Sequence, residues 1–150
     1  MAYTTTNPYT GEKLKTFPDA TDQEVQTALT DAYEAFKAWR HVSFAERAKV
    51  MTKAAEILRR DIDKYARLLT LEMGKLYTEA KLETELSAEI FEYYAAHAER
   101  LLKPEILPVA DPKEGKAMIV HQPQGIVFAV EPWNFPYYQI ARIIAPQLSA

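Results

Sequence analysis

The residue with the clearest chemical potential is Asn134, in a loop over residues 131–136. A carboxamide supplies an N–H donor without a charge, which suits an oxygen that becomes negative only during a reaction. The apolar run before this loop, residues 126–130, has the pattern of a strand buried on both faces, and open α/β sheets bind ligands at the carboxyl ends of such strands. Spacing alone nevertheless favours plainer roles, in which Asn134 bonds the backbone of its own turn and Trp133 lies in a core.

Other reactive side chains are scarce. The 150 residues contain no cysteine, which excludes disulfides, thiolate metal sites and a cysteine nucleophile within them. His41, His97 and His121 lack partners at metal-ligand spacing, so we expect no metal site. Neither a glycine-rich dinucleotide fingerprint nor a P-loop occurs. Helical periodicity spreads one series of glutamates over a solvated face, and we assign it no chemistry: Glu79, Glu83, Glu85, Glu89 and Glu92.

Composition limits the class of protein. Hydrophobic residues make up 48% and charged residues 26%, as in a soluble globular protein with a real core. A formal net charge of -3 provides no basic field for a phosphate backbone, so we expect no nucleic-acid partner. The longest apolar stretch, residues 117–130, is interrupted and too short for a membrane span. The polar residues 1–8 show no apolar leader, which makes the cytoplasm the expected compartment.

Three regions are expected along the chain. Residues 1–20 form an N-terminal arm, with a turn over residues 7–11 and an edge strand over residues 13–17. Residues 21–103 form a helical segment, and residues 104–150 hold a strand, a loop and a helix of the kind found in α/β sheets.

Capping patterns locate the helices. Thr21 with Glu24 and Ser43 with Glu46 have capping-box spacing and begin the first two helices, which we expect to pack as a hairpin. Gly74 is suited to the left-handed cap of the third. Side chains recur at helical steps in the first helix and in the long fourth helix, at Val25, Ala28, Leu29, Ala32, Phe36 and Trp39, and at Leu82, Leu86, Ile90, Tyr93, His97 and Leu101.

The last region begins where prolines interrupt the pattern. Residues 116–122 alternate like a strand, and residues 126–130 predict a second one. Pro136 takes the first position of a helix that begins at about Tyr137, and Pro146 must kink or end that helix. The connector before these elements is marked by Pro104, Pro108 and Pro112.

The sequence of residues 132–136, Pro-Trp-Asn-Phe-Pro, resembles the central motif of the aldehyde dehydrogenase superfamily, with the nearest likeness to its succinate-semialdehyde dehydrogenase branch. Glu131 departs from the small or apolar residue expected before this motif. The resemblance covers essentially the whole chain. Its further segments, in order, are residues 7–12, 35–39, 46–47, 71–75, 122–127 and 145–150.

This resemblance implies an α/β fold of aldehyde dehydrogenase type, in which the N-terminal arm and helical segment lead into the first strands of a Rossmann-like parallel sheet. It implies NAD(P)-dependent oxidation of an aldehyde to a carboxylic acid through a cysteine thiohemiacetal. The cysteine and the general-base glutamate lie far downstream in such enzymes. We therefore expect the first third of a longer enzyme, inactive alone and a homodimer or homotetramer at full length. By the same resemblance, residues 21–103 belong to the cofactor-binding domain, residues 104–150 begin its dinucleotide-binding sheet, and the catalytic domain is absent from this chain.

The resemblance also implies roles for individual residues. Asn134 is the oxyanion-hole amide, and Pro132, Trp133 and Asn134 line the cleft for NAD or NADP. Arg142 stands about two helical turns beyond Asn134, with Tyr138 on nearly the same face. Family members that oxidise succinate semialdehyde carry an arginine at this place, where its planar fork can hold the remote carboxylate of the substrate.

Alternatives stay open. Arg142 could lie on a solvent face, although its neighbours Ala141, Ile143 and Ile144 indicate an apolar helix. The substrate could be another aldehyde, of betaine or glyceraldehyde type. A third reading makes the 150 residues a complete, non-catalytic helical or cofactor-binding module.

Overall fold

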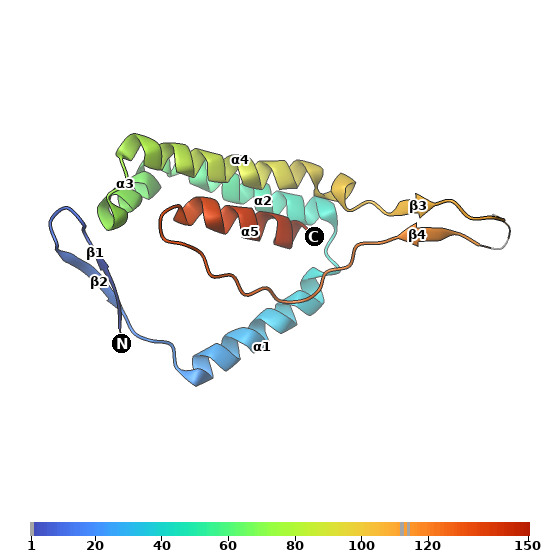
Figure 1. Ribbon diagram of the computed structural model, residues 1–150, viewed down its shortest axis with the longest axis horizontal. Helices are drawn as coiled ribbons and strands as arrows, with labels where there is room; N and C mark the ends of the chain where they lie inside the picture. The colour runs from blue at the N-terminus through green and yellow to red at the C-terminus, as the bar shows by residue number, and fades with distance from the viewer. Residues whose placement is uncertain (1, 112, 114) are drawn as a thin grey trace.

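The computed structural model describes residues 2–111, 113 and 115–150, so the connector position Pro112 lies outside the described residues. Helices dominate this part of the chain, and its strands form two hairpins at opposite ends (Figure 1). Within it, no helix combines the length and apolar character needed to cross a membrane. The elements are β1 (Tyr3–Thr6), β2 (Lys13–Phe17), α1 (Asp22–Trp39), α2 (Phe44–Arg60), α3 (Ile62–Met73), α4 (Tyr77–Leu101), β3 (Glu105–Leu107), β4 (Ala117–Ile119) and α5 (Pro136–Ser149).

The N-terminal arm is an antiparallel hairpin of β1 and β2, in which Tyr3 lies opposite Phe17. The Asn7 side chain accepts a hydrogen bond from the backbone N–H of Tyr9 at 2.9 Å and so holds the expected turn. The strand predicted over residues 13–17 is confirmed. Its partner β1 was not predicted, because a short threonine-rich strand has no alternating apolar pattern.

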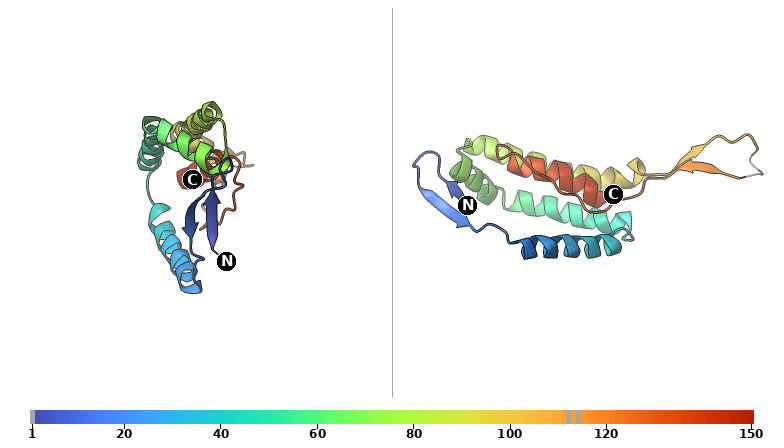
Figure 2. Two further views of the ribbon diagram at one scale, coloured as in Figure 1. Left: turned by 90° about the vertical axis from the view of Figure 1, so that its left-hand side faces the viewer. Right: turned by 60° about the horizontal axis from the view of Figure 1, so that its bottom comes forward.

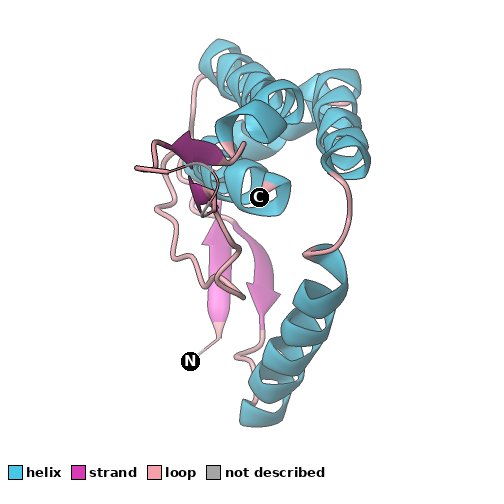
Figure 3. Ribbon diagram, turned by 90° about the vertical axis from the view of Figure 1, so that its right-hand side faces the viewer, coloured by secondary structure: helices cyan, strands magenta, loops and turns pink. Residues whose placement is uncertain are grey.

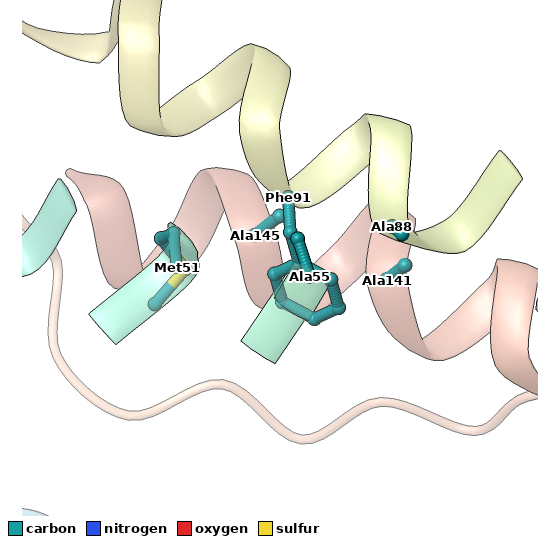
Figure 4. Close-up of a cluster of buried hydrophobic side chains, with 6 residues drawn as sticks. All are labelled: Met51, Ala55, Ala88, Phe91, Ala141 and Ala145. Atoms are coloured by element: carbon teal, nitrogen blue, oxygen red, sulfur yellow. The ribbon is translucent and has the colours of Figure 1, made fainter. Parts of the chain in front are cut away.

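Three helices form the core. In Figure 1 and in the right view of Figure 2, α2, α4 and α5 run side by side, and α3 packs across one end of α4. Alanines at the contacts allow the helix axes to approach closely around one large ring, that of Phe91. Figure 4 shows the central cluster of Met51, Ala55, Ala88, Phe91, Ala141 and Ala145.

The predicted helix ends are confirmed. Thr21 and Glu24 make both hydrogen bonds of a capping box at the start of α1. At the start of α2 only half of the expected capping box forms: the Ser43 hydroxyl accepts from the backbone N–H of Glu46 at 3.3 Å, while the Glu46 carboxylate pairs with Lys49. Gly74 follows α3 in the left-handed conformation, with φ of 74°.

The predicted hairpin between the first two helices is wrong. Every residue of α1 is at least partly exposed, including Val25 and Leu29 on its apolar face, and α1 stands apart from α2 in Figure 1. The apolar stripe of α2 is covered by α4 and α5 instead, which leaves α1 no partner face there. α1 is tied at its end, where the indole N–H of Trp39 donates to the Leu148 carbonyl at 2.9 Å.

The large side chains singled out on α4 lie mostly on its outer side. Leu82 is 63% exposed, and Leu86, Tyr93 and Leu101 are exposed as well. The buried face consists mainly of small side chains, since only these let α2 and α5 pack close to the α4 backbone. Its members are Ala80, Glu83, Thr84, Ser87, Ala88, Phe91 and Ala98.

The last region differs most from expectation. β4 lies within the strand predicted over residues 116–122 and pairs antiparallel with β3, which the connector unexpectedly forms. Residues 126–130 are not a strand: Phe128 is 90% exposed, and Figure 3 shows this part of the chain as loop. A strand needs a backbone hydrogen-bonding partner, and no segment of the described chain pairs with it. α5 begins at Pro136 as predicted and continues past Pro146 to Ser149.

Gly74 gives a prediction about stability. A Cβ at Gly74 would lie 3.0 Å from Cγ of Pro8, so Gly74→Ala strains the backbone and also pushes on the N-terminal turn. Gly11 has the same φ of 74° with nothing described within 4 Å, and Gly11→Ala carries the backbone cost alone, about 1 kcal/mol. We expect Gly74→Ala to lower the free energy of unfolding further than Gly11→Ala in urea titrations. Equal losses would contradict the contact with Pro8.

Candidate functional site

The loop that carries Asn134 lies on the surface at the start of α5. Trp133 is 76% exposed, and Pro132 and Asn134 are exposed too, so Trp133 is not a core residue. Within the described chain, the Asn134 carboxamide makes no hydrogen bond, and the alternative in which it bonds its own turn is wrong. The N–H groups of this amide are therefore available to a ligand.

The backbone of Asn134, by contrast, is held in place. Its carbonyl accepts a hydrogen bond from Nζ of Lys75 at 3.1 Å. The same ammonium group lies 3.5 Å from the ring centroid of Phe135, a cation–π contact with the next residue. Lys75 lies between α3 and α4, so the loop is tied to a segment far away in the sequence.

Glu83 caps α5 from a different helix. Its Oε1 accepts the backbone N–H groups of Tyr137 at 3.0 Å and Tyr138 at 3.3 Å. Its carboxylate also forms an ion pair with Lys75. Phe135, at the N-cap position of α5, makes no capping hydrogen bond with its own side chain, and Glu83 satisfies the free N–H groups in its place.

The interpretation of the glutamate series as a solvated face is wrong at Glu83, which is 3% exposed. Glu85 and Glu92 keep side chains that are 38% and 45% exposed, and both form ion pairs with Arg59 of α2. These hydrogen bonds from Arg59 lower the pKa of the Glu92 carboxyl. The signal for Glu83 was present in its spacing, three residues from Ala80 and four from Ser87, within the small-residue stripe of α4.

The two candidate substrate residues lie on one face of α5, as predicted. The Arg142 guanidinium carbon lies 5.7 Å from the ring centroid of Tyr138. The Tyr138 ring in turn meets Phe135 edge-on at 6.3 Å, which links this face to the loop of Asn134. Arg142 is exposed, and no carboxylate of the described chain forms an ion pair with it. The guanidinium is therefore open to an anionic ligand.

Tyr137 is the most strongly perturbed tyrosine near the site. Its hydroxyl donates to the Tyr65 carbonyl at 3.3 Å, and the two rings meet edge-on at 5.6 Å. Burial, which disfavours the phenolate, raises the pKa of Tyr137 to about 12, and the ionised forms of Tyr65, Glu72 and Glu83 act in the same direction. The side chain is thus a neutral packing element at ordinary pH.

This pKa predicts a loss of stability in alkali. The phenol of Tyr137 stays protonated in the folded state up to about pH 12, whereas in an unfolded chain it ionises near pH 10. The stabilisation is complete below the unfolded pKa and disappears as the pH rises through the folded one. Between about pH 9 and about pH 11, Tyr137→Phe should lose less free energy of unfolding in urea than the wild type.

Tyr9→Phe is the matched control, because Tyr9 is 94% exposed. It should lose as much stability over that interval as the wild type. Equal losses in all three proteins would show that Tyr137 is not the group responsible.

The site offers three chemical features to a ligand. It offers a neutral N–H donor on a fixed backbone, exposed apolar surface at Trp133, and a free guanidinium about two turns along α5. Among the described residues, no group of three or more histidines and acidic side chains is arranged to hold a metal ion. The arrangement suits binding of an oxygen that develops negative charge, together with recognition of an anionic group nearby.

The chain is similar to known proteins along nearly its whole length. The model of the aldehyde dehydrogenase family matches residues 1–150. The NADP(+) succinate-semialdehyde dehydrogenase of Deinococcus radiodurans is 42% identical over 146 residues, which cover 97% of this chain and 30% of that protein. The corresponding protein of Mycobacterium avium is 44% identical over 151 residues, covering 100% of this chain and 32% of its own length.

A solved structure also superposes on the chain. The crystal structure of succinic semialdehyde dehydrogenase from Streptococcus pyogenes in complex with NADP+ superposes with a TM-score of 0.91 at 46% identity. The match covers 97% of this chain and 32% of that one. The chain thus spans about a third of the length of these relatives.

Proposed function

The chain belongs to the aldehyde dehydrogenase family, and we propose that it serves in the NADP+-dependent oxidation of succinate semialdehyde to the dicarboxylate. The observation that carries this proposal is the free carboxamide of Asn134 on an anchored backbone, with the unpaired guanidinium of Arg142 farther along α5 in the described chain. The names of the relatives from Deinococcus radiodurans and Mycobacterium avium support both the substrate and NADP+ as cofactor.

The residues of the loop fit a nicotinamide cofactor. The exposed indole of Trp133 and the ring of Pro132 offer flat apolar surface beside an unengaged amide. When bound, the cofactor accepts a hydride from the substrate carbon. Pro132 and Trp133 would hold it against the loop, and Asn134 would donate an N–H to the substrate oxygen as that oxygen becomes negative.

Arg142 would bind the other end of the substrate. Its fork of N–H donors can hold a carboxylate through two parallel hydrogen bonds, which fixes the aldehyde end at the loop. Tyr138 lies against the guanidinium and would limit its rotamers. A betaine-type aldehyde carries a positive charge and would be repelled at this position.

The nucleophile must come from outside these residues. A thiohemiacetal needs a thiolate, and residues 1–150 contain no cysteine. We propose that the working enzyme joins this chain to a catalytic domain, in a cytoplasmic homodimer or homotetramer, as the family resemblance implies. Residues 1–150 alone should then reduce no NADP+ in the presence of the aldehyde.

The test is the aldehyde-dependent reduction of cofactor by the whole enzyme. We expect kcat/KM to be highest for succinate semialdehyde with NADP+, lower with NAD+, and lowest for betaine aldehyde. A higher kcat/KM for betaine aldehyde than for succinate semialdehyde would overturn the proposed substrate. Turnover by residues 1–150 alone would overturn the proposal that the nucleophile lies outside them.

A further inference from the structure

We propose that Glu83 and Lys75 form a buried ion pair that positions Asn134 for catalysis, an inference that rests on the proposed function of Asn134. Neither residue touches the reacting atoms in this view. They act through the backbone on either side of the amide.

Burial is the first observation. In this ion pair the Lys75 side chain is 10% exposed and that of Glu83 is 1% exposed, whereas each of the other ion pairs described has a partner at least 35% exposed. A charge removed from water in this way is costly unless its hydrogen-bonding capacity is used. Here the groups that use it belong to the Asn134 loop and the start of α5.

The second observation is that the pair makes hydrogen bonds to the backbone at two places, the Asn134 loop and the start of α5. Lys75 donates to the carbonyl of Asn134, which fixes the peptide plane between Asn134 and Phe135. Glu83 accepts the backbone N–H groups of Tyr137 and Tyr138, which fixes the first turn of α5. The Asn134 side chain is free, yet the direction in which it leaves the backbone is determined.

The electrostatic consequence favours the proposed reaction. Because the carboxylate and the ammonium neutralise each other, this pair holds the Asn134 loop by strong hydrogen bonds and adds no net charge of its own. An unpaired Glu83 would repel an oxygen that becomes negative, and an unpaired Lys75 would attract bound anions in the ground state. A neutral pair leaves stabilisation to the amide, which is preorganised before the substrate arrives.

Glu83→Gln in the whole enzyme is the main test. The amide keeps a carbonyl oxygen for the two N–H groups but offers Lys75 no charge, so the loop loosens while its shape persists. We expect kcat to fall about 10- to 100-fold, the cost of misplacing a catalytic group by about 1 Å, with the KM values for aldehyde and NADP+ little changed. Glu85→Gln is the matched control on the same helix, and its kcat should equal that of the wild type.

A double-mutant cycle separates positioning from general structure. In an Asn134→Ala background, Glu83→Gln should lower kcat no further, because the group that it positions is gone. An equal loss in both backgrounds, or an unchanged kcat for the single variant, would overturn the positioning role. If Asn134→Ala alone leaves kcat unchanged, the proposed role of Asn134 fails, and the positioning role fails with it.

Lys75→Met covers the case in which Glu83→Gln does not fold. It removes the donor to the Asn134 carbonyl, and it should show the same loss of kcat and the same non-additivity with Asn134→Ala. Failure of both variants to fold would identify the pair as a core element and overturn the proposal.

Discussion

Asn134→Ala in the whole enzyme is expected to lower kcat by about 100- to 1000-fold, the usual cost of removing one oxyanion donor. The carboxamide makes no hydrogen bond within the described chain, so its removal breaks no internal contact of that part of the molecule. Stability should therefore change little. The measurement is steady-state kinetics with succinate semialdehyde and NADP+, alongside thermal unfolding of both proteins.

The KM values provide the internal control for this prediction. An N–H that strengthens its bond only as the oxygen becomes negative contributes to the transition state and little to substrate binding, so KM should stay within a few-fold of the wild type. Asn134→Asp replaces the donor by a carboxylate of the same size and should be at least as slow. A kcat within about tenfold of the wild type for both variants would remove the oxyanion role.

Elements determined by local chemistry were predicted correctly. Thr21, Ser43 and Gly74 mark helix ends through hydrogen bonds or φ angles within a few residues, and each behaves as expected. The fold class is confirmed as well, because the resemblance covered the whole chain and the Streptococcus pyogenes enzyme superposes with a TM-score of 0.91. Local signals are sufficient where the structure depends on neighbours in the sequence.

Features that depend on distant partners were missed. The run over residues 126–130 has the composition of a buried strand, but a strand forms only when another segment supplies hydrogen bonds, and none does in the described chain. On α4, large apolar residues recur at helical spacing, and this pattern drew attention to the exposed side of the helix. The spacing of Glu83 places it within the small-residue stripe of α4, but its role could not be predicted because its partners Lys75 and Tyr137 lie outside that helix.

The candidate site was predicted in part. The exposed amide of Asn134 and the shared face of Tyr138 and Arg142 follow from the loop motif and from helical spacing. The support beneath the loop could not be predicted, because Lys75 reaches Asn134 across a separation that no sequence period reveals. The candidate site residues lie within one stretch of the sequence, whereas Lys75 and Glu83, which hold that stretch in place, are far from it in the sequence.

Arg142→Leu is expected to raise the KM for succinate semialdehyde by about 10- to 100-fold. This corresponds to the loss of a bidentate, charge-assisted interaction with the carboxylate of the substrate. Leucine keeps apolar volume against the ring of Tyr138, from which the guanidinium now lies 5.7 Å. The oxyanion donor is untouched, so kcat at saturating substrate should change less than KM. Steady-state kinetics over a wide range of aldehyde concentration measures both quantities.

A second substrate separates carboxylate recognition from a general effect of the Arg142→Leu substitution. A straight-chain aliphatic aldehyde of similar length carries no carboxylate, so its KM should stay near the wild-type value or fall slightly as this face of α5 becomes more apolar. Arg142→Lys keeps the charge but not the fork and should lie between wild type and Arg142→Leu. If Arg142→Leu raises the KM of both aldehydes equally, Arg142 supports the helix rather than the substrate, and the assignment to succinate semialdehyde loses its physical basis in this chain.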